Sequence, residues 1–145
     1  MRYRDTGNVH KDFHLATHRT VNYVLSNYGM DFLRELFRRT AQDVYRSIWE
    51  DLKKGDIGQL VEHWEYYYGR EKARFEFEEL ANTKIFHVLE CPYLMHLKKH
   101  GVKIDSNAYL PTILINEFWS EQSPFTIETI IKAETAYDQI IQRRA

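Results

Sequence analysis

The sequence predicts an α+β fold in which N-terminal helices pack on a small antiparallel sheet made of two hairpins. Three observations lead to this prediction. Apolar residues recur every three or four positions through the first half of the chain, as in amphipathic helices. The period changes to two at Lys72, and a second alternating segment begins at Phe125. A helical group followed by hairpins is typical of an α+β domain.

The size of the chain indicates one domain covering residues 1–145. Its 145 residues are 43% hydrophobic, which is enough to bury a core without a disulfide or a metal. We find no internal repeat, no low-complexity stretch and no linker rich in proline or glycine. A second domain is therefore not expected.

Three helices are predicted in the first half. The first covers residues 11–28, and Gly29 can stop it. The second is expected to run without a break over residues 31–54, where the apolar positions keep helical spacing throughout. Asp56 can cap a third helix that ends near Gly69.

The first hairpin is predicted over residues 72–91, with a turn at Asn82-Thr83 and an end at Cys91-Pro92. Proline can begin a short helix over residues 93–99. A further helix is expected over residues 109–119, despite a proline near its start. The first hairpin is thus separated from the last segment by two helices.

The last segment has two interpretations. Apolar positions alternate from Phe125 to Ile131, and after a turn near Glu134 the residues 137–142 could return as a partner strand. A helix over residues 126–144 is the competing interpretation. The two-hairpin prediction depends on the first alternative.

Charge and cysteine content exclude several classes of function. Twenty Lys and Arg balance twenty-one Asp and Glu, so the chain lacks the positive field that non-specific nucleic-acid binding needs. No apolar run approaches the roughly 20 residues that cross a bilayer. One cysteine excludes an internal disulfide, and no signal peptide is visible, so we expect a cytoplasmic protein without nucleic-acid or membrane partners.

Two histidine rows have the spacing of helical metal ligands. His10, His14 and His18 would lie within an arc of about 80° on one helix. His96 and His100 repeat the spacing, but neighbouring lysines disfavour binding of a cation there. A third ligand and a carboxylate pattern such as HExxH are missing. We therefore predict solvated or hydrogen-bonded histidines, with no metal and no cofactor.

Cys91 is the candidate nucleophile. It is expected at a strand end before a helix, where free backbone N–H groups and the helix dipole can lower the pKa of a thiol. An inert core cysteine is the alternative. His87 is expected on the same strand face but about 13 Å away, too far to deprotonate the thiol directly. The base would come from His14, His18 or Glu65 if the fold brings one of them to the strand end.

An aromatic cluster could line a substrate pocket with hydroxyl donors. Its members are Trp64, Tyr66, Tyr67 and Tyr68, with Phe75 and Phe77 nearby, and the residues expected to contact a substrate are Trp64, Tyr67, Tyr68, Phe75 and Phe77. Core packing, with the tyrosine hydroxyl groups reaching water, explains the same residues. Both interpretations remain open at this point.

Several features in chain order carry a resemblance to a known family. They are the helical first half, residues 63–68 (HWEYYY) before a charged strand, residues 88–92 (VLECP) at a strand end, the short helix before Gly101, and Ser123-Pro124-Phe125. Together they cover nearly the whole chain. They resemble the L-2-amino-thiazoline-4-carboxylic acid hydrolase-like family of small bacterial proteins. The resemblance implies hydrolysis of a C–N bond in a thiazoline-like or cyclic amidine amino acid.

The chain departs from that family in its cysteines. The family pattern has further cysteines where this chain has Tyr109-Leu110 and Tyr137-Asp138, so only Cys91 is retained. We therefore consider a hydrolase with Cys91 as nucleophile, His14 or His18 as base and His87 as an acid. A second hypothesis is a non-catalytic module that binds a small apolar or aromatic ligand. A third is a homodimer that buries an exposed aromatic face.

Overall fold

The computed structural model describes residues 10–145 and confirms the α+β fold. The helices are Asp12–Tyr28 (α1), Met30–Arg39 (α2), Arg46–Lys53 (α3), Gly58–Arg70 (α4), Pro92–Lys99 (α5) and Ser106–Ser120 (α6), with a π-helical turn at Thr40–Val44. The strands are Arg74–Leu80 (β1), Thr83–Glu90 (β2), Phe125–Ala133 (β3) and Ala136–Arg143 (β4). In this part of the chain, no helix combines the length and the apolar character that crossing a bilayer requires.

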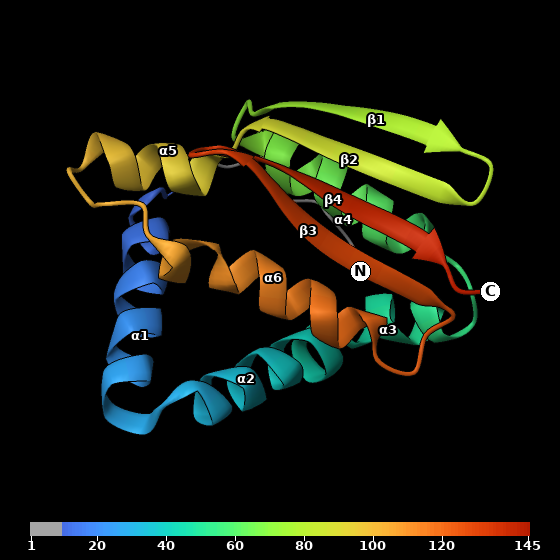
Figure 1. The fold of residues 1–145 in the computed structure, drawn as a ribbon, viewed down its shortest axis with the longest axis horizontal. Coiled ribbons are helices and arrows are strands. Elements are labelled where there is room, and N and C mark those ends of the chain that lie inside the picture. Colours follow the sequence, from blue (N-terminus) through green and yellow to red (C-terminus); the bar gives the residue numbers. More distant parts are fainter. Residues whose placement is uncertain (1–9) are drawn as a thin grey trace.

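The two predicted hairpins are present and form one sheet. β2 pairs with β4, so the strand order is β1-β2-β4-β3 and every pairing is antiparallel (Figure 1). Phe86 on β2 lies opposite Phe77 on one side and Gln139 on the other. Because Phe125 begins a strand, the competing interpretation of a helix over residues 126–144 is wrong.

Helices α4 and α6 pack against one face of the sheet, as the alternation of side chains requires. Trp64 of α4 stacks on Phe86 of β2, with ring centroids 5.3 Å apart. Asn116 of α6 donates a hydrogen bond of 2.8 Å to Gln139 of β4. The core therefore lies between these two helices and the inward side chains of the strands.

Helices α1 and α2 form a corner on the far side of α6 (Figure 1). Gly29 alone separates them, and its φ of 85° lies in a region that favours glycine. Its N–H group caps α1 by donating to the carbonyl groups of Val24 and Leu25. The predicted helix end at Gly29 is thus confirmed.

The prediction of one unbroken helix over residues 31–54 is wrong. The π-helical turn Thr40–Val44 follows α2, and Tyr45 N–H donates to Thr40 C=O at 3.0 Å, five residues back. Tyr45 then leaves helical geometry with φ −95° and ψ 35° before α3 begins. Ala41, Ile48 and Leu52 are all buried in spite of this break, so the apolar spacing gave no sign of it.

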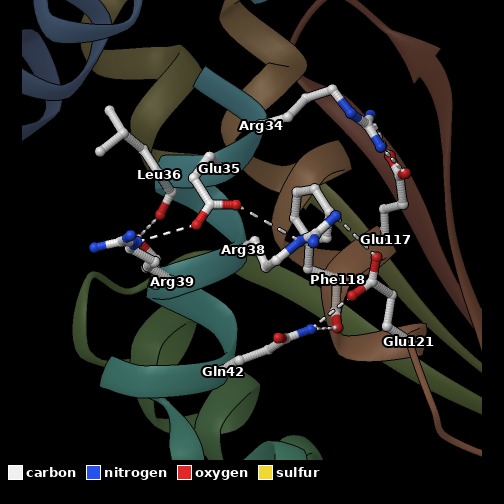
Figure 2. Close-up of polar contacts among 10 residues, drawn as sticks. Arg34, Glu35, Leu36, Arg38, Arg39, Gln42, Glu117, Phe118 and Glu121 are labelled. Atoms are coloured by element: carbon white, nitrogen blue, oxygen red, sulfur yellow. Dashed lines mark hydrogen bonds and ion pairs between the residues drawn. The ribbon is translucent and has the colours of Figure 1, made fainter. Parts of the chain in front are cut away.

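Side chains of α2 and α6 hold the two helices together on the outside (Figure 2). The guanidinium carbons of Arg34 and Arg38 lie 5.2 and 5.1 Å from the ring centroid of buried Phe118. Arg34 also pairs with Glu117 at 2.9 Å, and Arg38 pairs with Glu121 at 3.4 Å. Exposed ion pairs contribute little individually, so the contacts of the arginines with the buried ring add to what these pairs contribute.

Candidate functional site

A cavity of about 360 Å³ lies between the helices and β4. Small-molecule sites typically measure about 300–1,000 Å³, so this volume suits a small ligand. Its lining residues are Phe13, His14, Thr17, Phe37, Thr40, Tyr45, His63, Trp64, Tyr67, Tyr68, Cys91, Pro92, Tyr93, Pro111, Thr112, Ile115, Trp119, Tyr137 and Gln139. Phe13 of α1 is the most exposed of these residues, at 41%.

Five of the residues singled out from the sequence meet in this cavity. They are Cys91, His14, Trp64, Tyr67 and Tyr68. They come from α1, α4 and the residue before α5, which lie far apart in the sequence. The roles predicted for them remain predictions, but their common location is a property of the fold.

Three other predicted residues lie away from the cavity. His18 is buried and its Nε2 accepts a hydrogen bond of 3.0 Å from Asn22 Nδ2. Phe75 and Phe77 of β1 pack on Phe86, with ring centroids 5.1 and 4.6 Å apart. For these two aromatic residues, core packing is the interpretation that fits.

His87 does not share a face with Cys91, and that expectation is wrong. Phe86 and Val88 on either side of it are buried, so alternation turns His87 to the opposite face of the sheet. There its Nδ1 lies 2.7 Å from Asp138 and its Nε2 lies 3.0 Å from Glu78. The hydrogen bond that His87 donates to the Asp138 carboxylate is the largest cause of a raised pKa of His87, and the one that it donates to Glu78 is the second.

The raised pKa of His87 predicts a pH-dependent contribution to stability. A histidine in the unfolded chain has a pKa of about 6.5, so the contribution is complete below that pH and is lost as pH rises through the higher folded pKa. At pH 5.5 we expect the free energy of unfolding of the wild type to be higher than that of His87→Gln, by less than about 1 kcal/mol. Denaturant titrations at pH 5.5 and 8.5 would check this, and a difference that grows with pH would contradict it.

The environment of Cys91 disfavours a thiolate. Its side chain is 2% exposed, and Sγ lies 3.3 Å from the hydroxyl oxygen of Tyr137. Burial raises the pKa of the Cys91 thiol, while Tyr137 and the backbone N–H groups of Leu94 and Tyr93 lower it by less. The thiol is therefore protonated at neutral pH and is a weak nucleophile without a strong base.

A chain of buried polar groups runs from Cys91 into the core. The hydroxyl oxygens of Tyr137 and Tyr68 are 2.5 Å apart, and Gln139 Nε2 lies 3.5 Å from that of Tyr68. Asn116 Nδ2 donates to Gln139 Oε1, the other polar atom of that amide. The sequence analysis did not identify this network. The available signal was Gln139, a polar residue at an inward-facing position of β4 between Tyr137 and Ile141.

His14 forms a buried pair with a residue that the sequence did not point to. Its Nε2 lies 2.7 Å from Glu71 Oε1, and the two side chains are 1% and 2% exposed. Glu71 is the cap residue after α4, so the pair ties α1 to the end of α4. No spacing signal could reveal this contact because the two residues are 57 positions apart.

His63 was another omission, and it supplies an uncharged imidazole to the cavity wall. Its ring packs against Tyr45 and Trp119, with centroids 4.9 and 5.9 Å apart. Burial lowers the pKa of His63 to about 4. His63 is therefore neutral at physiological pH.

The cavity wall contains few groups that can carry a charge. Of the described residues that line it, none is Asp, Glu, Lys or Arg, and His14 is paired with Glu71, which is not among the lining residues. Burial also raises the pKa of the lining phenols, which belong to Tyr45, Tyr67, Tyr68, Tyr93 and Tyr137. The lining thus offers hydroxyl, thiol and amide hydrogen-bonding groups within an aromatic surface.

Comparison of the chain with family models, with curated proteins and with solved structures finds no match. The resemblance to a hydrolase-like family therefore stays a prediction. The chemistry of the site has to be inferred from its own geometry.

The histidine rows do not form a metal centre among residues 10–145. His10 is exposed, while His14 and His18 bind Glu71 and Asn22 separately. Within this range, no three side chains of His, Cys, Asp or Glu come together in a way that could hold a metal ion. The arrangement can orient an organic molecule through hydrogen bonds and ring contacts.

Proposed function

We propose that the chain binds a small, uncharged and mainly apolar molecule in the cavity that Cys91 and Tyr137 line. The observation that carries the proposal is the aromatic-rich wall of a cavity of about 360 Å³, whose described lining residues include no Asp, Glu, Lys or Arg. Burying a charged group without a partner costs several kcal/mol, so such a wall selects against ions. Aromatic side chains at the same time offer large contact surfaces to an apolar ligand.

The proposal predicts discrimination by charge between two dyes of similar shape. N-phenyl-1-naphthylamine is neutral, and 8-anilinonaphthalene-1-sulfonate is the same skeleton with an anionic group. We expect the neutral dye to bind the wild type at least about 10-fold more tightly, because the sulfonate would meet no counter-charge in the cavity. Fluorescence titration of the purified protein with each dye gives both dissociation constants.

Two tryptophan substitutions test whether the dye enters the cavity. Thr112→Trp places a large side chain in the lining and should abolish binding of the neutral dye. Thr20→Trp, on the exposed side of α1, is the matched control and should leave binding unchanged. Equal binding by wild type and Thr112→Trp, or no preference for the neutral dye, would refute the proposal.

Hydrolysis of a C–N bond in a thiazoline-like or cyclic amidine amino acid is our second proposal. It is supported by the position of Cys91 on the cavity wall at the start of α5, with His14 lining the same cavity. The raised pKa of the thiol and the scarcity of chargeable groups in the wall make it the weaker of the two. Rates of hydrolysis of such acids by wild type and Cys91→Ala would decide, since equal rates would exclude the thiol from the mechanism.

A further inference from the structure

The polar chain behind Cys91 is fixed in direction at its amide end. Both N–H groups of Asn116 Nδ2 are used, one by Thr129 Oγ1 at 3.0 Å and one by Gln139 Oε1 at 2.8 Å. Gln139 can then only donate, through Nε2, to the hydroxyl oxygen of Tyr68. The hydroxyl groups of Tyr68 and Tyr137 share the next hydrogen bond, in which either oxygen can be the donor.

The reverse direction is disfavoured by what it would leave unpaired. Asn116 Oδ1 is buried and has no hydrogen-bond partner in the part of the chain that the structure describes. Rotating the side-chain amide of Asn116 by half a turn would put its NH₂ group in the place of Oδ1. Buried N–H groups without partners are rarer in proteins than carbonyl groups without partners, so the orientation in which Gln139 Nε2 donates to Tyr68 is retained.

The groups around the Cys91 thiol leave its hydrogen available. The backbone N–H groups of Tyr93 and Leu94 donate toward Sγ, and the Tyr137 hydroxyl lies 3.3 Å from it. When Tyr137 also donates to Sγ, the S–H hydrogen has no partner in this contact. The thiol belongs to the cavity lining, so a molecule in the cavity can accept this hydrogen.

A second donor is found two residues away. The hydroxyl oxygen of Tyr93 is buried and lacks a hydrogen-bond partner among the described residues, and Tyr93 also lines the cavity. Buried hydroxyl groups are nearly always hydrogen-bonded, to protein, to water or to a ligand. Cys91 directly precedes α5 and Tyr93 is the second residue of that helix, and both residues line the cavity.

We propose that the molecule bound in the cavity carries a hydrogen-bond acceptor, such as the carbonyl oxygen of a ketone, lactone or lactam, that accepts from the Tyr93 hydroxyl and the Cys91 thiol. This inference rests on the proposed binding of an uncharged ligand and adds the chemical group that is recognised. The aromatic wall would hold the body of the molecule, and the start of α5 would orient its polar end.

Two ligands that differ only in the acceptor provide the test. 1-Acetylnaphthalene has a carbonyl oxygen where 1-isopropenylnaphthalene has a CH₂ group of similar size. We expect the wild type to bind the ketone about 2- to 10-fold more tightly than the hydrocarbon, the range for one net hydrogen bond. Displacement of the neutral dye measures both affinities. The carbonyl stretch of the bound ketone should also move to lower frequency than in hydrocarbon solvent.

Variants at both donors decide the role of α5. Tyr93→Phe and Cys91→Ala should each bring the ketone-to-hydrocarbon ratio toward one, and Cys91→Ser should keep a ratio above one. Tyr109→Phe is the matched control, because its hydroxyl group donates to Glu134 C=O outside the cavity, and it should retain the wild-type ratio. Binding of both ligands with a ratio that neither Tyr93→Phe nor Cys91→Ala alters would overturn this inference alone. Binding of neither ligand would overturn the proposed function together with it.

Discussion

Replacement of Phe86 by alanine is expected to lower the free energy of unfolding by about 3–5 kcal/mol. Phe86 is 0% exposed and stacks on Trp64 at 5.3 Å. The rings of Tyr68 and Phe75 also lie 5.1 Å from it. Its removal leaves a void between α4 and the sheet that these rigid rings cannot fill. Urea denaturation followed by far-UV circular dichroism would measure the loss.

The conservative variant Phe86→Leu separates the void from the loss of the ring. A smaller change in volume should cost clearly less than the alanine substitution, since cores tolerate hydrophobic replacements of similar size. A loss of less than about 1 kcal/mol for Phe86→Ala would mean that the aromatic cluster collapses around the site. The packing described for α4 and β2 would then be too flexible to define the cavity wall.

His14→Ala is expected to destabilise the fold by a similar amount, about 3–5 kcal/mol. The substitution removes the imidazole that pairs with Glu71 Oε1 and leaves the carboxylate buried. Glu71 Oε2 already lacks a partner among residues 10–145. A buried carboxylate without hydrogen bonds is one of the few single defects that cause a large loss of stability. The same denaturation experiment measures it.

His18→Ala is the matched control for His14→Ala. His18 lies one turn further along α1 and is also buried, but its partner is the neutral amide of Asn22. We expect a loss of about 1–3 kcal/mol, the cost of an unmade hydrogen bond. The double variant His14→Ala with Glu71→Gln should recover part of the loss of the single variant. Equal losses for His14→Ala and His18→Ala would show that Glu71 contributes no charge effect.

The strands could be predicted because their residues alternate strictly. Arg74 to Glu78 places charged and aromatic residues on opposite faces, and β1 has the expected burial pattern. Phe125 and Ile127 signal β3 in the same way, and both are buried. The pairing of β2 with β4 could not be predicted, since alternation defines the faces of a strand and not its neighbours.

The break between α2 and α3 could not be predicted for a different reason. The extra residue of a π-helical turn rotates the following side chains around the helix axis by only part of a turn. The apolar side of the helix covers a broad arc, so residues after the break still fall within it. Ala41 before the break and Ile48 after it are therefore both buried. The prediction that His87 and Cys91 share a face failed because the register of β1 and β2 shifts near the end of β2. Arg74 pairs with Glu90 and Phe75 with Val88, so Leu89 is an extra residue that reverses the alternation before Cys91.

The candidate site was predictable only in part because it is assembled from distant segments. Residue type drew attention to Cys91 and His14, since thiols and imidazoles are chemically versatile. Glu71, Tyr93 and Tyr137 are common residue types without a distinguishing spacing. Only the folded chain brings them within hydrogen-bonding distance of the others or into the same cavity.

The strand order β1-β2-β4-β3 has a consequence for synthesis on the ribosome. Strand β4 occupies an inner position although it is translated after the other three, so β2 keeps a bare edge until residues 136–143 have emerged. Tyr137 and Gln139 arrive with that strand and complete the wall around the thiol. A nascent chain that stalls before residue 136 would therefore have both hairpin strands β1 and β2 but no enclosed binding chamber, and its open edge would be a target for chaperones.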